Sequence, residues 1–220
     1  MKKKRGIFIA IEGGDGAGKD TQIERIKSFF GASRDILSTS SLGGTSLGRA
    51  FREVILSPKH TAVTPETELL LFCAARAQLM NEIVIPALKE GQTVITNRFD
   101  GATAAYQIYG RKREHLYEVF KTINTLALTD DETGLVFAPD AYILLDVAPE
   151  IGIARKSGKT EGLDRIEAET PGFHKRVRRG FKTYLRQEHS GRHSIINANR
   201  EVDAVWEDMK KHLERIFSFA

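Results

Sequence analysis

The sequence is poor in cysteine and in long uninterrupted apolar runs. Its 220 residues include one cysteine, Cys73, which excludes an internal disulfide and fits a reducing compartment. Cys73 lies within the apolar run LLLFCAARA, so we expect it to pack in the core rather than act as a nucleophile. No stretch reads as long enough to span a membrane, and the apolar segment after the basic residues 2–5 is too short for a signal peptide. We therefore expect a cytoplasmic protein with no membrane partner.

The chain also lacks internal repeats, low-complexity segments and a large net charge. The formal net charge is +4, and the basic residues are not interleaved with aromatic residues along one segment, so we expect no nucleic-acid partner. The densest cationic run, HKRVRRGFK at 174–182, should be mostly solvated or should face ligand phosphates. His189 and His193 are four residues apart, but no third ligand lies near them in sequence, so the spacing does not indicate a zinc site.

Short apolar runs alternate with longer helical patterns, which predicts βα units around a parallel sheet. We expect five strands, at 6–11, 35–40, 93–97, 141–146 and 194–198. Helices are expected at 19–30, at 45–56, from 65 past Pro86 with a kink there, from about Asp100, and at 202–219. Residues 129–139 and 155–162 should be irregular. The predicted fold class is α/β, with a five-stranded parallel sheet and helices on both faces, in a single domain over residues 1–220.

The stretch GGDGAGKDTQ at 13–22 has the spacing of a phosphate-binding loop, and it follows a predicted strand and precedes a predicted helix. Glycines let the backbone N–H groups turn inward, and those groups, the helix N-terminus and the Lys19 ammonium all favour anionic phosphates. We therefore expect ATP to be bound by nine consecutive residues: Gly13, Gly14, Asp15, Gly16, Ala17, Gly18, Lys19, Asp20 and Thr21.

Position 20 departs from the usual loop, in which Ser or Thr supplies a hydroxyl that helps to hold Mg²⁺. A carboxylate beside the phosphates repels them unless a metal lies between or the side chain points outward, and Asp20 would also be an ordinary first-turn helix residue. Thr21 is one place late for the metal-binding hydroxyl. Mg²⁺ should then be held mainly by water, by ligand phosphates and by a carboxylate elsewhere.

Three later stretches carry further candidate residues. Phe72 and Arg76 are four residues apart in LLLFCAARAQ, so on a helix they share a face that suits a base and its phosphate, although Phe72 alone would also suit the core. Arg98 leaves the carboxyl end of a predicted strand, where ligands bind in open α/β sheets. A helix with Thr103, Tyr106 and Gln107 follows, and GLDRIEAE occupies 162–169.

Taken in order, these stretches resemble the thymidylate kinases, which phosphorylate dTMP to dTDP with ATP. The resemblance rests on IAIEGGDGAGKDTQ, GGT at 43–45, LLLFCAARAQ, NRFDGATAAYQ, PDAYILLDVAPE at 139–150 and LDRIEAE, and it covers nearly the whole chain. The glycine loop alone would be weak evidence, but the loop together with NRF, AYQ and LDRIE is specific. The resemblance implies a three-layer P-loop NTPase fold.

The resemblance implies a role for each matched residue. Lys19 would hold the β- and γ-phosphates of ATP, and Asp15 would lie near the sugar 3′-hydroxyl and the Mg²⁺ ion. Phe72 would stack on thymine, Arg76 would bond the edge of the base, and Arg98 would grip the phosphate of dTMP. Thr103 would help to read the base, Tyr106 would lie against the deoxyribose where a 2′-hydroxyl would be crowded, and Gln107 would add a polar contact.

The resemblance also implies a basic lid at about 155–163 and a homodimer. The residue after Asp15 is Gly16 rather than arginine, so the catalytic cations should come from the lid, as in the bacterial-like form. That lid carries Arg155, Lys156 and Lys159, and we expect Arg155 and Lys159 to act with Lys19 and Arg98 in catalysis.

Several positions depart from the family pattern. Ser40, Ser41 and Leu42 stand where the family often has Arg-Glu-Pro, and Asn97 stands where it usually has an acid before the arginine. The lid has lysines where relatives have arginines. Two alternatives therefore stay open: a nucleoside monophosphate kinase that acts on another base, and a non-catalytic nucleotide-binding protein.

Overall fold

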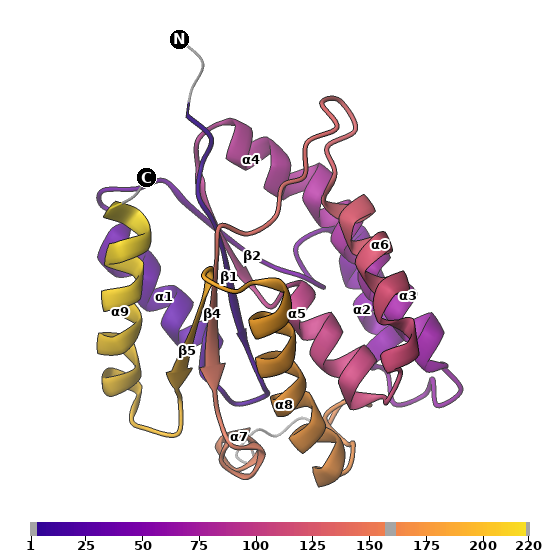
Figure 1. Cartoon of the computed structure of the whole chain (residues 1–220). Coiled ribbons are helices and arrows are strands. Elements are labelled where there is room, and N and C mark those ends of the chain that lie inside the picture. Colours follow the sequence, from indigo (N-terminus) through magenta and orange to yellow (C-terminus); the bar gives the residue numbers. More distant parts are fainter. Residues whose placement is uncertain (1–3, 157–161, 219–220) are drawn as a thin grey trace.

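The computed structural model describes residues 4–156 and 162–218, and within them one sheet organises the chain (Figure 1). Its five strands are β1 (Phe8–Gly13), β2 (Ile36–Ser40), β3 (Thr93–Asn97), β4 (Ala141–Asp146) and β5 (His193–Asn197). They lie in the order β2-β3-β1-β4-β5 and all pair in parallel, which confirms the predicted fold class. The carboxyl ends of the strands therefore meet at one edge, where the following loops converge.

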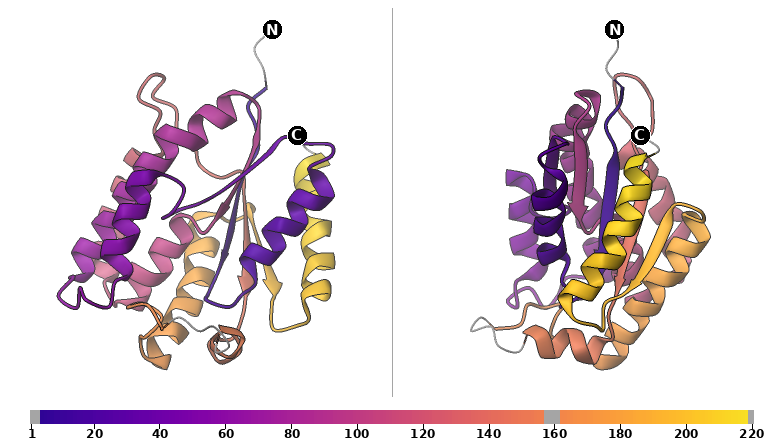
Figure 2. Two further views of the ribbon diagram at one scale, coloured as in Figure 1. Left: turned by 180° about the vertical axis from the view of Figure 1, so that it is seen from behind. Right: turned by 90° about the vertical axis from the view of Figure 1, so that its left-hand side faces the viewer.

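Alternate side chains along the strands point to opposite faces of the sheet and belong to two separate apolar cores, one on each face. Ile9 and Ile11 of β1 pack with the inner faces of α1 (Lys19–Phe30) and α9 (Val202–Ser218), whereas Phe8 and Ala10 pack on the opposite side. The α1 and α9 helices cover one face together, and the remaining long helices lie on the other (Figures 1 and 2). Strands buried on both faces explain the nearly continuous apolar runs in the sequence.

The helices predicted at 19–30, 45–56, from 65 and at 202–219 fall close to their observed positions, whereas no range was predicted for the helices at Tyr117–Leu128, Pro149–Lys156 and Pro171–Glu188. Threonine hydroxyls accept backbone N–H groups at the starts of three helices, Thr45 before α2 (Ser46–Leu56), Thr64 before α3 (Pro65–Leu79) and Thr170 before α8 (Pro171–Glu188). The others are α4 (Ile85–Lys89), α5 (Asp100–Thr103), α6 (Tyr117–Leu128), α7 (Pro149–Lys156), the π-helices η1 (Met80–Val84) and η2 (Ala104–Gly110), and a 3₁₀ turn η3 (Glu114–Leu116).

The helix through Pro86 corrects one prediction and refines another. From Pro65 to Lys89 it is long and apolar enough to cross a membrane by length and composition, so our statement that no stretch reaches that length was wrong. Its buried side chains, Leu69, Cys73, Leu79, Met80, Val84 and Leu88, belong to the core beside the sheet. Ahead of Pro86 the backbone widens into η1, which relieves the contact that proline makes with the preceding turn.

The cationic run at 174–182 is less solvated than we predicted. It lies in α8, which packs along η2, and the ring of His174 is buried. Arg178 and Lys182 form ion pairs with Asp146 at the end of β4, with N–O distances of 2.6 and 2.7 Å. Arg178 and Lys182 are thus paired within the protein, because α8 crosses the sheet edge where Asp146 emerges.

Candidate active site

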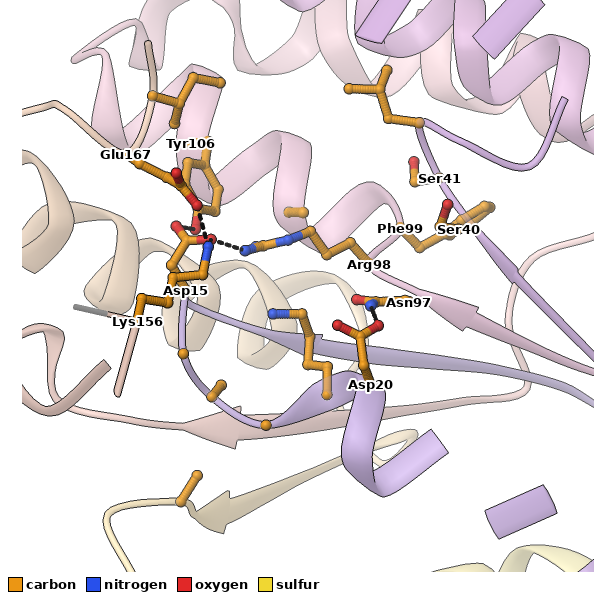
Figure 3. Close-up of a pocket in the computed structure, with 18 of the residues that line it drawn as sticks. Asp15, Asp20, Ser40, Ser41, Asn97, Arg98, Phe99, Tyr106, Lys156 and Glu167 are labelled. Carbon is orange, nitrogen blue, oxygen red and sulfur yellow. Dashed lines mark hydrogen bonds and ion pairs between the residues drawn. The ribbon is translucent and has the colours of Figure 1, made fainter. Parts of the chain in front are cut away.

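A cavity of about 570 Å³ opens at the carboxyl edge of the sheet (Figure 3). It is lined by the glycine loop, the ends of β2 and β3, the α5–η2 helix, the last turn of α7, residues 164–167 and the segment that leads into α9. This volume falls within the range of small-molecule sites. The sequence-predicted phosphate loop and the predicted acceptor residues therefore face one space.

The glycine loop adopts conformations that require glycine at two points. Gly16 has φ +68°, and a Cβ there would lie 2.1 Å from the carbonyl oxygen of Gly152 in α7. Gly18 has φ +85° and caps α1, so the first N–H groups of that helix open toward the cavity. The loop is thus shaped for a bound anion.

Lys19 is buried at the base of the loop. Its Nζ donates to the carbonyl oxygens of Gly13 and Gly14, at 3.1 and 2.9 Å. Burial and the nearby charge of Arg98 lower the pKa of Lys19 to about 7, against the opposing effect of Asp15 and other carboxylates. A phosphate placed in the loop would supply the negative charge that favours the protonated lysine.

Arg98 and Asp15 form the central ion pair of the cavity. The Nη2 of Arg98 donates to Oδ1 of Asp15 at 2.8 Å, and the hydroxyl of Tyr106 donates to Oδ2 at the same distance. Arg98 has φ +63°, a strained conformation for a residue other than glycine, which aims its side chain back over the loop. Burial alone would raise the pKa of Asp15, but Arg98, Lys19 and Lys156 together hold it below its usual range.

Arg155 and Lys156, at the start of the predicted lid, both contact residues around the cavity. Lys156 lies between two carboxylates, 3.5 Å from Oδ1 of Asp15 and hydrogen-bonded to Glu167. Arg155 donates to the carbonyl oxygens of Ala198 and Arg200, at 2.8 and 3.0 Å, so it braces the segment before α9. Lys159 and most of the predicted lid, residues 157–161, lie outside the described residues.

On the acceptor side, Phe72, Thr103, Tyr106 and Gln107 all line the cavity. Arg76 does not. It is completely buried and donates to Oδ1 of Asn124 at 2.9 Å, to the carbonyl oxygen of Phe99 and to the hydroxyl of Thr103. The expectation that Arg76 and Phe72 face the same space is therefore not met in this structure, and the contact of Arg76 with thymine stays a prediction.

Behind Gln107, a buried carboxylate organises this wall. Both oxygens of Glu68 accept from Arg111, and Oε1 also accepts from Nε2 of Gln107 at 2.9 Å. Oε2 accepts from Arg165 at 2.6 Å, which ties the LDRIE segment to α3. Sequence reasoning missed Glu68, because its partners lie 39 to 97 residues away.

A second buried carboxylate, Glu12, supports the backbone after Arg98. Its Oε1 accepts from the N–H groups of Phe99 and Ala102, at 3.0 and 3.2 Å, and its Oε2 has no partner among the described residues. Burial and the neighbouring Asp100 raise the pKa of Glu12 to about 7. The sequence pattern IAIEGG could have indicated a role for Glu12, because burying an acid in an apolar strand is costly unless it is hydrogen-bonded.

Asp20, which departs from the usual phosphate loop, and Asn97, which departs from the family pattern, meet in the cavity. Nδ2 of Asn97, at the end of β3, donates to Oδ1 of Asp20, in the first turn of α1, at 2.5 Å (Figure 3). The other amide atom of Asn97, Oδ1, is buried and has no hydrogen-bond partner in the described part of the chain. Asp20 is exposed and lines the cavity, and within residues 4–156 and 162–218 it forms no ion pair.

Comparisons with known proteins agree with this geometry. A family model described as Thymidylate kinase matches residues 11–209. The chain is 38% identical to a protein named thymidylate kinase from Carboxydothermus hydrogenoformans, over 96% of this chain and 98% of that one. It is 37% identical to a protein of the same name from Clostridium novyi, over 96% and 99%, and 36% identical to one from Exiguobacterium, over 96% of each.

Proposed function

The chain belongs to the thymidylate kinase family, and from this premise we propose how its cavity phosphorylates dTMP. The chain is a phosphotransferase of nucleotide biosynthesis that transfers the γ-phosphoryl group of ATP to dTMP. The observation that carries the assignment of the site is the convergence of a phosphate loop and an aromatic, arginine-bearing wall on one cavity. Such a cavity places two phosphates in line, and positioning with charge neutralisation is most of what phosphoryl transfer requires.

ATP lies in the glycine loop in this proposal. The N–H groups of residues 13–21 and the ammonium of Lys19 hold its β- and γ-phosphates. Arg155 braces the segment at 198–200, and Ala198, Arg200 and Val202 line the adjoining part of the cavity, which suits the nucleoside of ATP. Arg155 and Lys159 are also proposed to add charge from the lid and to act with Lys19 and Arg98 in catalysis.

The acceptor dTMP lies between Phe72 and Arg98. Phe72 stacks on the base, and Thr103 and Gln107 read its polar edge with Arg76 behind them. Tyr106 and Asp15 lie beside the sugar. Arg98 and Lys156, which pair with Asp15 in the structure, also bind the phosphate of dTMP. That phosphate is already ionised near neutral pH, so the reaction needs no strong general base.

The donor set at the end of β3 fits Mg²⁺. Asp20 offers a carboxylate, Asn97 has an unpartnered buried carbonyl oxygen, and no group of three or more His, Cys, Asp and Glu side chains gathers within residues 4–156 and 162–218. Mg²⁺ accepts one or two carboxylates, with phosphates and water completing its shell. When bound, the ion neutralises charge on the transferring phosphates. Asp15, which we also propose as a residue near the metal, has its oxygens engaged by Arg98, Tyr106 and Lys156.

Steady-state transfer from Mg·ATP to dTMP, dUMP, dCMP, UMP and dGMP tests this assignment. We expect dTMP to be the preferred acceptor, and Lys19→Ala to lower kcat by about 10²- to 10³-fold, because a preorganised charge at the transferring phosphates is lost. Normal turnover by the Lys19→Ala enzyme would contradict the assignment of the glycine loop as the site of the ATP phosphates. A different leading acceptor would overturn the base assignment, and nucleotide binding without turnover would favour the binding-protein alternative.

Three broader properties belong to the same proposal. We expect the chain to form one domain with a lid at about 155–163, to act in the cytoplasm without nucleic-acid or membrane partners, and to work as a homodimer.

A further inference from the structure

Asp20 and Asn97 occupy the two places that normally hold nucleotide-bound Mg²⁺ in loops of this class. The first place, directly after the loop lysine, usually carries a Ser or Thr hydroxyl, and the second is an acid that follows a strand. In this chain the acid stands at the first place, and a neutral amide stands at the second. The two positions together still offer one carboxylate and one neutral oxygen, but each group stands at the position where the other is usual.

The tertiary structure brings these two positions together. Asn97 is the last residue of β3 and lies in register with Ile11 of β1 and Ser40 of β2. Asp20 lies in the first turn of α1, directly after Lys19. Their side chains meet at 2.5 Å although they are 77 residues apart, and both line the cavity (Figure 3).

Asp20 differs from the other carboxylates that line the cavity. Asp15 and Glu167 face Arg98 and Lys156. Asp164 accepts the N–H groups of Ile166 and Glu167. Within the described residues Asp20 accepts only from the neutral amide of Asn97 and forms no direct ion pair, although its charge acts on Lys19 from further away. A carboxylate left this way next to anions is unfavourable unless a cation is shared between them.

We propose that Asp20 is the carboxylate ligand of the nucleotide-bound divalent cation, with Asn97 orienting it, so that acid and neutral ligand have exchanged places in this chain. The proposal rests on the assigned function of the loop but not on dTMP as the acceptor. Asn97 donates through Nδ2 to one oxygen of Asp20, which leaves the other oxygen of Asp20 and the unpartnered Oδ1 of Asn97 for the metal or its water.

The test measures binding of a non-hydrolysable ATP analogue by calorimetry, with saturating Mn²⁺ and with a chelator, in the absence of acceptor. The ratio of the two dissociation constants reports the contribution of the metal. We expect Asp20→Asn to reduce this ratio about 10- to 100-fold, the range seen when groups that hold a metal are changed. Without metal, Asp20→Asn should bind the analogue as tightly as the parent or more tightly, because a repulsive charge is gone.

The double variant Asp20→Ser, Asn97→Asp restores the usual arrangement and should recover most of the metal ratio. Glu24→Gln is the matched control, because Glu24 lies one turn further along α1, is exposed and pairs with Lys27. It should leave the ratio unchanged. Thermal melts of each variant establish that it is folded.

Two results would overturn the proposal. If Asp20→Asn tightens binding equally with and without Mn²⁺, the carboxylate only repels phosphate. If Asp20→Asn changes neither dissociation constant, Asp20 is not a metal ligand. If the double variant fails to recover the ratio of the two constants, the acid and the neutral ligand have not exchanged places. Turnover of dTMP by the parent enzyme is measured separately, so a failure of the proposed acceptor would be distinguished from a failure of the metal ligand.

Discussion

At the scale of single residues, the site depends on charges that the fold buries and then balances. Lys19, Arg98 and Asp15 compensate one another across the cavity, whereas Glu12 lies behind them with one unpartnered oxygen. Because no cation pairs directly with Glu12 in the described structure, burial dominates its titration. Glu12 therefore makes stability depend on pH in the opposite sense from an ion-paired carboxylate.

We predict that Glu12→Gln changes the slope of stability against pH. The pKa of Glu12 is raised from 4.5 to about 7 on folding, so between these values the folded chain keeps a proton that the unfolded chain loses. The contribution of Glu12 to the stability of the parent therefore falls as pH rises from 4.5 to 7 and levels off above, by a total of about 3 kcal/mol. The Gln oxygen can still accept from Phe99 and Ala102 but does not titrate.

Urea denaturation at several pH values between 4.5 and 7.5 checks this prediction. The variant should gain stability relative to the parent as pH rises. If the amide introduced by Glu12→Gln lacks a hydrogen-bond partner, the free energy of unfolding changes by the same amount at every pH, and its slope against pH is not affected. Parallel curves for the parent and Glu12→Gln would show that Glu12 does not titrate in this range.

At the scale of elements, the closeness of α8 and η2 positions the acceptor wall. Two glycines permit it: a Cβ on Gly180 would lie 2.7 Å from Cβ of Tyr109, and one on Gly110 would lie 2.8 Å from the ring of Phe173. The same packing sets the ring of Tyr106 edge-on against Phe173 and Phe181, with centroids 6.1 and 5.9 Å apart. The orientation of Tyr106 in the cavity thus depends on a contact between helices.

We predict that Gly180→Ala destabilises the protein even though alanine favours helix. Separating two packed helices should cost about 1–3 kcal/mol, which exceeds the gain in helix propensity of about 1 kcal/mol. Gly172→Ala is the control on the same helix, because its nearest neighbour atom would be 3.6 Å away. Thermal melts should show a lower Tm for Gly180→Ala and an unchanged or slightly raised Tm for Gly172→Ala. Equal Tm values would refute the packing argument.

At the scale of the whole molecule, α2, α3 and α6 lie side by side along one edge (Figure 1). These helices also expose large apolar side chains. Leu126 is 73% exposed and Leu70 is 54% exposed, and a patch of such residues on adjacent helices would mark an interaction surface. Further exposed members on these helices are Leu47, Val54 and Val119. Together with the family resemblance, this supports the proposed homodimer through these helices.

We predict that the chain elutes with twice its monomer mass in light-scattering chromatography and that Leu126→Glu shifts it toward monomer, because a charge would be buried at the interface. Leu135→Glu is the matched control, since Leu135 is similarly exposed but lies in the loop after α6. A parent that is monomeric at all concentrations, or equal masses for the two variants, would contradict this interface.

The sequence by itself determined the features that depend on neighbours along the chain. The spacing of Gly13, Gly18 and Lys19 and the apolar runs of the strands act within a few residues, so the loop, the parallel sheet and the positions of several helices were predictable. The sequence motifs also predicted residues of the acceptor wall, and Phe72, Thr103 and Tyr106 line the cavity.

Only the tertiary structure decided how distant side chains pair. The register of β1 with β3 and the seating of α1 bring Asp20 to Asn97, and the return of the chain through α7 brings Lys156 to Asp15. The packing of α3 against α6 turns Arg76 away from the cavity toward Asn124. These contacts join residues 48 to 141 positions apart, and their geometry depends on packing in three dimensions, which no local pattern encodes.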